Sequence, residues 1–177
     1  MRTDIVIAGG STTVVDGTLR VNIGNTTLAP DGIDPTDPAL ARAVYEVILP
    51  RATRNAPGDI AVVRVSVVPP VLARAAWTGS FAAVAELRPT LDRAADRRPV
   101  WLRREAFPDG ARLVASPERE RRVTWFTPVF FTADLRRAVV YYHHLWGSLC
   151  AEGVMVWLTR TDAGVWQIGG SQLMWIS

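Results

Sequence analysis

The fold class follows from the stretch RAVVYYHHLW at residues 137–146. It is rich in β-branched and aromatic residues, a composition typical of strands. Because successive side chains of a strand point to opposite faces, two sets of residues separate. One face takes Ala138, Val140, Tyr142, His144 and Trp146, and the other takes Val139, Tyr141, His143 and Leu145.

Similar stretches surround this strand along the last third of the chain. Further strands are predicted over residues 123–131, 153–160, 164–169 and 172–176. Short turns at Ala133-Asp134 and Asp162-Ala163-Gly164 separate them. Successive strands joined by short turns predict an antiparallel meander.

The first half of the chain has a different pattern. Residues 3–8 predict a strand, and Asp16-Gly17 predicts the turn of a hairpin. Asp37 and Pro38 mark the start of a helix that we expect to end at Pro50. A buried strand over 60–68 and helix-prone segments over 71–77 and 80–88 follow. Helices first and strands last predict an α+β fold, with a curved sheet packed on one layer of helix.

Composition sets the outer limits. The 177 residues are 49% apolar and 21% charged, which fits a single globular domain over residues 1–177. Cys150 is the one cysteine, and we interpret it as a small buried hydrophobe in a reducing compartment. Neither a signal peptide nor an apolar run of membrane-spanning length is recognisable, so we expect a cytoplasmic protein with no membrane partner.

All 20 basic residues are arginine, a bias typical of GC-rich bacterial genomes. Without lysine, Schiff-base catalysis and a Walker-type phosphate loop are excluded. Residues 88–122 hold ten Arg against six Asp or Glu, a local net charge of +4. The interspersed acids favour a solvated, salt-bridged face over a nucleic-acid surface. The alternative is a surface for an anion or an acidic partner.

Motifs for cofactors and metals are lacking. Gly9-Gly10 follows a predicted strand, but the next residues predict a strand and a turn where a dinucleotide fold needs a helix. No Gly-x-Ser-x-Gly elbow, cysteine pair or His-x-x-x-His occurs. We therefore expect no cofactor and no metal.

His143 and His144 are the only histidines, and adjacency on a strand turns them to opposite faces. Each is either a hydrogen-bonded core residue or a general acid or base, a role that histidine fills near neutral pH. As catalytic candidates we take His144 or His143, with Tyr142 or Tyr141 assisting proton transfer.

Seven tryptophans are an unusual number for this length, and five of them fall in the C-terminal sheet. They form either a solid core or the walls of an apolar pocket in a curved sheet. The pocket hypothesis assigns substrate binding to five aromatic residues: Trp125, Trp146, Trp157, Trp175 and Tyr45.

Several segments resemble an uncharacterised family of small bacterial α+β proteins. They are residues 130–142, 147–153, 164–166 and 175–177, together with the helix segment 44–49 and the strand 60–68. In that family the turn near Cys150 often carries two cysteines, and here the earlier one is absent. The resemblance implies a shared α+β fold and no activity.

These observations lead to two functional hypotheses. The first is a small cofactor-independent enzyme of cyclase, isomerase or hydratase type, acting on an apolar small molecule in bacterial specialised metabolism. The second is a non-catalytic module that binds a ligand or a protein through the arginine-rich face 88–122. A homodimer is compatible with both.

Overall fold

The computed structural model has the α+β fold that the sequence predicts. It describes residues 3–7, 10–15, 18–23, 26–28, 34–53, 60–66, 68–69, 72, 77–95, 99–115, 117, 120, 122–146 and 150–176. The turn residues Asp16-Gly17 and most of the helix-prone segment 71–77 lie outside this description.

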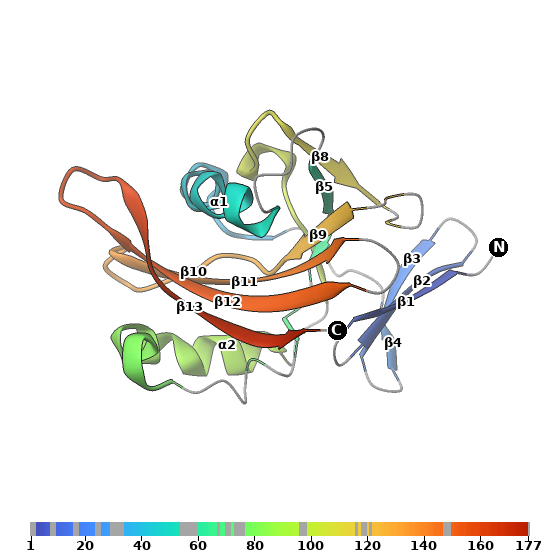
Figure 1. Ribbon diagram of the computed structural model, residues 1–177, viewed down its shortest axis with the longest axis horizontal. Coiled ribbons are helices and arrows are strands. Elements are labelled where there is room, and N and C mark those ends of the chain that lie inside the picture. The colour runs from blue at the N-terminus through green and yellow to red at the C-terminus, as the bar shows by residue number, and fades with distance from the viewer. Residues whose placement is uncertain are drawn as a thin grey trace.

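A mixed sheet forms the centre of the molecule (Figure 1). Its strand order is β13 (Trp166–Ile176), β12 (Ala151–Arg160), β11 (Arg137–Trp146), β9 (Arg122–Phe126), β5 (Ile60–Val63) and β8 (Ala111–Val114). The short β10 (Phe130–Phe131) also pairs with β11. From β13 to β9 every pairing is antiparallel, which confirms the predicted meander. β5 is parallel to both β9 and β8.

Helices cover both faces of this sheet, not one (Figure 1). α1 (Pro38–Ala52) packs on the face of Val140 and Tyr142, and we call this the α1 face. The 3-10 helix η2 (Gly79–Leu87) and α2 (Arg88–Ala95) pack on the face of Val139 and Tyr141, the α2 face. The physical reason is that both side-chain sets of β11 are apolar, so each face needs a cover.

The remaining strands form two smaller sheets. β1 (Thr3–Ile7), β2 (Gly10–Val15), β3 (Thr18–Ile23) and β4 (Thr26–Leu28) build an antiparallel sheet of four strands. Val15 pairs with Thr18, so the strands of the predicted hairpin are present. β6 (Val65–Ser66) pairs with β7 (Val100–Trp101), and the short helix η3 (Arg104–Ala106) follows.

Local sequence explains how α1 begins. The Asp37 carboxylate accepts hydrogen bonds from the backbone N–H groups of Ala39 and Leu40, and Pro38 fills the first helical position. The helix runs past Pro50 to Ala52, so the end that we expected at Pro50 is wrong by two residues. The helix is already in its last turn there, so little further helix is left for the proline to disrupt.

Three predicted strands have different limits because the chain changes partner inside them. The stretch 60–68 breaks at Arg64, whose N–H donates to Val114 O and whose carbonyl accepts from Leu102. The stretch 123–131 divides into β9 and β10. The two strands expected over 164–169 and 172–176 are one strand, β13, which has register shifts at Gly169 and Met174 and no break between the expected strands.

None of the described helices is both long and apolar enough to cross a lipid bilayer.

Candidate functional site

The two histidines occupy opposite faces of β11, as the alternation predicts. His143 lies on the α2 face and directly opposite Trp125 of β9, and His144 lies on the α1 face directly opposite Thr124. Both side chains are buried, with exposed fractions of 3% and 4%. Each imidazole also stacks on a tryptophan ring, but their hydrogen bonding differs.

His143 belongs to a cluster of aromatic rings, which we call the tryptophan cluster: Trp125, Tyr141, His143 and Trp175. Its imidazole stacks on Trp125, with ring centroids 4.7 Å apart and planes 18° apart. Trp175 meets the same imidazole edge-on at 4.7 Å. The rings therefore enclose the imidazole on two sides.

The polar atoms of this cluster are poorly satisfied. Both ring nitrogens of His143 lack a hydrogen-bond partner among the described residues, and so does the indole Nε1 of Trp125. Burial first, and the neighbouring His144 second, lower the pKa of His143 from its usual 6.5 to about 4. The ring is therefore neutral at physiological pH.

Trp175 is held in place by a hydrogen bond from its Nε1 to Tyr141 Oη at 2.8 Å. Gly153 makes this contact possible, because a Cβ there would overlap both the indole nitrogen and the phenol oxygen. Burial raises the pKa of Tyr141 to about 12, although the hydrogen bond from Trp175 acts in the opposite direction. Such a phenol holds its proton at neutral pH.

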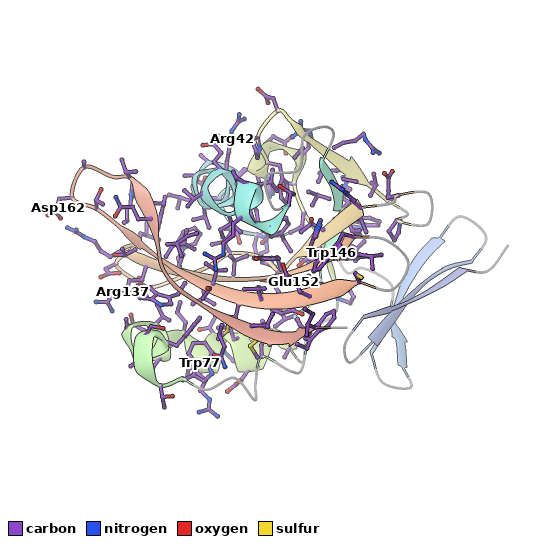
Figure 2. The ribbon with its side chains drawn as sticks, in the orientation of Figure 1. Arg42, Trp77, Arg137, Trp146, Glu152 and Asp162 are labelled. Carbon is purple, nitrogen blue, oxygen red and sulfur yellow. The ribbon has the colours of Figure 1, made fainter. Side chains whose placement is uncertain are left out.

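On the α1 face, three polar residues form a row across neighbouring strands, the His144 row: Thr124, His144 and Glu152. Thr124 Oγ1 and His144 Nδ1 are 2.8 Å apart, and both side chains are buried. Glu152 lies directly opposite His144 on β12. Trp146 stacks on His144 at 5.4 Å, and Figure 2 shows Trp146 and Glu152 near the same end of the sheet.

Two other predicted site residues are core residues of the α1 face. Tyr45 is fully buried, stacks on Phe107 at 4.4 Å, and donates its hydroxyl to Thr127 O at 2.8 Å. Burial and then the charge of Asp34 hold the pKa of Tyr45 well above its usual value of 10.0. Tyr142 is 2% exposed and packs near Phe126. Neither faces the tryptophan cluster.

Trp157 lies on the α2 face, directly opposite Val139. Val139 is four residues before His143 on β11. Its ring fills the space above Gly169 and Gly170, where a Cβ would collide with it. The predicted aromatic set is therefore divided between two faces, and only Trp125 and Trp175 meet a histidine on the α2 face.

A pocket of about 200 Å³ lies where β9 separates from β11, and we call it the Ser66 pocket. Its walls come from the segment before α1, from β6, β7 and α2, and from the link between β9 and β10. The lining residues are Asp34, Pro35, Thr36, Ser66, Val68, Ala94, Val100, Pro128, Val129 and Phe130.

Two buried polar side chains interrupt this mainly apolar wall. The Ser66 hydroxyl is buried and has no hydrogen-bond partner among the described residues. Asp34 is 3% exposed, and its Oδ1 accepts hydrogen bonds from the N–H and the hydroxyl of Thr36. A bound molecule with one polar group could satisfy Ser66 and approach the Asp34 carboxylate.

Sequence reasoning missed this pocket. Asp34 reads as a loop residue before Pro35, and Ser66 as one position of a buried strand. The break at Arg64, which re-pairs the chain with β7, brings Ser66 to the pocket. No signal in the sequence marks that change of partner.

The described arginines of 88–122 are largely engaged within the chain. Arg112 forms two hydrogen bonds with Glu120, each 2.9 Å long. Arg103 donates to Asp34 O, and Arg104 donates to the carbonyls of Phe107 and Pro108. Arg97, Arg98, Arg119 and Arg121 lie outside the described residues. Of these contacts the one between Arg112 and Glu120 is an ion pair, and the others are hydrogen bonds to backbone carbonyls, so the salt-bridged interpretation stays a prediction.

Cys150 is exposed at the turn between β11 and β12, so its interpretation as a buried hydrophobe is wrong. The position lies just before β12, and its carbonyl accepts from Trp146 N, which holds it at the end of the sheet. Among the described residues, no three His, Cys, Asp or Glu side chains converge as metal ligands would.

Comparison with known proteins adds nothing to this geometry. No family model, no curated protein and no solved structure matches the chain.

Proposed function

We propose that this protein binds a small, mainly apolar molecule carrying one hydrogen-bonding group in the Ser66 pocket. The observation that carries the proposal is Ser66, a residue of the mainly apolar pocket wall whose buried hydroxyl has no hydrogen-bond partner among the described residues. An unsatisfied buried polar group costs roughly 1–3 kcal/mol, so a ligand that pairs with it gains affinity.

The volume limits the ligand. A cavity of about 150 Å³ lined by apolar side chains accepts benzene. The Ser66 pocket, at about 200 Å³, therefore suits a molecule of one ring with a small substituent. Its apolar walls, Val68, Val129 and Phe130 among them, favour a ring over a sugar or an amino acid.

We further propose that the protein performs cofactor-independent proton transfer on this molecule. Asp34 supplies a carboxylate at the wall, and the Ser66 hydroxyl supplies a donor for a carbonyl or hydroxyl of the substrate. Isomerisation, hydration and cyclisation each need this equipment. A reaction of this type in bacterial specialised metabolism is the function that we retain for the chain.

Binding is tested with phenol and benzene as probes in ligand-observed NMR titrations. We expect phenol to bind more tightly than benzene. Ser66→Ala should lower the affinity for phenol roughly 2- to 10-fold, which corresponds to one net hydrogen bond, and leave the affinity for benzene unchanged. Ala94→Phe fills the pocket and should abolish binding of both probes. Ala85→Phe is the control, because it lies at an exposed position of η2 that does not line the pocket, and it should leave binding of both probes unchanged. Equal binding of both probes to Ser66→Ala and to the native chain would contradict the proposal.

Proton transfer is tested without knowing the substrate. Cyclohexanone and acetophenone are incubated with the protein in D2O, and exchange of their α-protons is followed by NMR. We expect exchange above the buffer rate, and Asp34→Asn, which keeps the Oδ1 acceptor for Thr36, returns it to that rate.

A second catalytic candidate rests on the His144 row. The 2.8 Å contact with Thr124 fixes one ring nitrogen of His144, and Glu152 stands directly opposite on the neighbouring strand. A buried histidine with a hydroxyl at hydrogen-bond distance and a glutamate directly opposite in the sheet is suited to general acid or base catalysis. The exchange assay separates the two candidates. If proton exchange is lost in His144→Gln but not in Asp34→Asn, the chemistry belongs to the His144 row.

A further inference from the structure

β13 forms one edge of the large sheet, and its outer side pairs with no strand among the described residues. The strand is eleven residues long. Natural proteins protect long edges with charged residues, prolines or early termination, because unpaired backbone groups attract another strand. Residues 163–176 contain no charged residue and no proline, so β13 lacks the sequence devices of a protected edge.

Exposed apolar side chains concentrate along the same edge. Four large apolar side chains among the described residues are exposed, and two of them lie within β13. They are Leu173 at 55% and Ile176 at 63%, whereas Val165 at 56% lies before the strand. An uncharged edge beside exposed apolar side chains is typical of an interface.

Two register shifts in β13 determine which face each residue takes. Leu173 lies opposite Val154 and Ser171 contacts Arg51 of α1, so both face the α1 side. Gly169 and Gly170 lie against Trp157 on the α2 side. Met174 and Trp175 also take the α2 side, through the core of that face and through Tyr141.

The sequence around Gln172 is complementary to itself. Three small residues, GGS at 169–171, precede it, and three large residues, LMW at 173–175, follow it. In an antiparallel pair of two copies centred on Gln172, Leu173 meets Ser171 of the other copy. Met174 likewise meets Gly170, and Trp175 meets Gly169. In these three pairs a large residue stands opposite a small one, whereas Ile176 stands opposite Ile168 at each end. Trp157 of the same copy already lies over Gly169 and Gly170, so Met174 and Trp175 of the other copy pack beside that indole.

The faces select this centre. Residues directly opposite in an antiparallel pair must point to the same side of the sheet. When the pair is centred on Gln172, Leu173 lies opposite Ser171 and both are on the α1 side. Trp175 likewise lies opposite Gly169, and both are on the α2 side. A centre moved by one residue to Ser171 places Leu173 opposite Gly169, which faces the other way.

We propose that a second copy of this chain docks on β13, through antiparallel pairing of residues 168–176 about a twofold axis at Gln172. The axis is perpendicular to the sheet, so the two large sheets become continuous and α1 of each copy lies on the same side. The strand itself carries no charge, so its own residues meet those of an identical copy without like-charge repulsion. The inference is independent of the ligand proposed for the Ser66 pocket.

The first test measures the mass of the full chain by light scattering after size-exclusion chromatography, over a wide concentration range. We expect twice the 19.4 kDa of one chain. Leu173→Arg places a charge within the pair and halves the mass. Because Leu173 is more than half exposed, the fold should survive, and circular dichroism checks this. Val165→Arg, at an equally exposed site outside the paired residues, leaves the dimer intact.

A second test examines the register. In a Cys150→Ser background, Gln172→Cys places two thiols on the twofold axis, where paired Cα atoms are about 4.5–5.5 Å apart and a disulfide can form. Oxidation should yield a covalent dimer, whereas Val165→Cys in the same background should not. A native chain that is monomeric throughout, a Leu173→Arg chain that stays dimeric, or equal crosslinking at both positions overturns the proposal.

Discussion

His143 and His144 are neighbours in the chain and opposites in the fold. His144 has a hydrogen-bond partner in Thr124 and a carboxylate opposite it in Glu152. His143 has two aromatic rings against it and no hydrogen-bond partner among the described residues. Strand alternation assigns them to different faces, and the polarity of the cross-strand neighbour decides the rest. Position in the sequence therefore says little about what a buried histidine is equipped to do.

The largest expected difference between the two faces is in pH dependence. Because the pKa of His143 is lowered to about 4, the folded ring stays neutral where an unfolded histidine, at about 6.5, binds a proton. The unfolded state then binds more protons, so the free energy of unfolding falls as the pH drops from about 6.5 to about 4. The loss is about 3 kcal/mol.

Urea unfolding over this pH range at one protein concentration measures the loss. His143→Phe replaces the imidazole by a ring that does not titrate. The slope of the free energy of unfolding against pH that is due to this residue should therefore disappear. A His143→Phe chain with the same slope as the native chain would show that other groups cause the acid sensitivity.

The next effect concerns the packing of the α2 face. Gly153→Ala introduces a Cβ where Trp175 Nε1 and Tyr141 Oη now meet, so the indole must move away from the phenol. Overpacking of this kind costs about 2 kcal/mol. Gly110→Ala is the matched control, because nothing lies within 4 Å of the added atom. Equal urea midpoints for the two variants would mean that the tryptophan cluster adapts freely.

Direct replacement of each histidine compares the two faces more finely. His144→Phe leaves the buried Thr124 hydroxyl without its partner, at a cost of about 1–3 kcal/mol. His143→Phe removes ring nitrogens that have no partner among the described residues, so at neutral pH it changes stability by less than about 0.5 kcal/mol or increases it.

A double variant checks the cause. Thr124→Val combined with His144→Phe removes both partners of the hydrogen bond and should recover part of the loss. If His143→Phe and His144→Phe lower the free energy of unfolding by the same amount, the different surroundings of the two histidines do not affect stability.

A loss no larger than that of His144→Phe is expected when the hydrogen bond between Trp175 and Tyr141 in the tryptophan cluster is removed. Trp175→Phe keeps an aromatic ring beside His143 but removes the N–H donor to Tyr141, at a cost of about 1 kcal/mol. Thermal unfolding measures the shift. In a Gly153→Ala background the same substitution should cost less, because the hydrogen bond is already displaced.

The α+β class, the β11 strand and the antiparallel meander could all be predicted, because strong alternation and local turns encode them. The start of α1 was equally local, through Asp37 and Pro38. The parallel pairing of β5 and the packing of helices on the second face could not be predicted, since they depend on contacts between distant segments. The predicted aromatic site combined residues that lie on two faces of the sheet.

The sequence by itself determined that His143 and His144 face opposite ways, because successive side chains of a strand alternate between its faces. Only the tertiary structure decided which neighbours each histidine has, because cross-strand partners come from register and not from order along the chain. It alone also brought Asp34 and Ser66 to one pocket. Periodicity acts over a few residues, whereas a site is assembled by contacts across the whole fold.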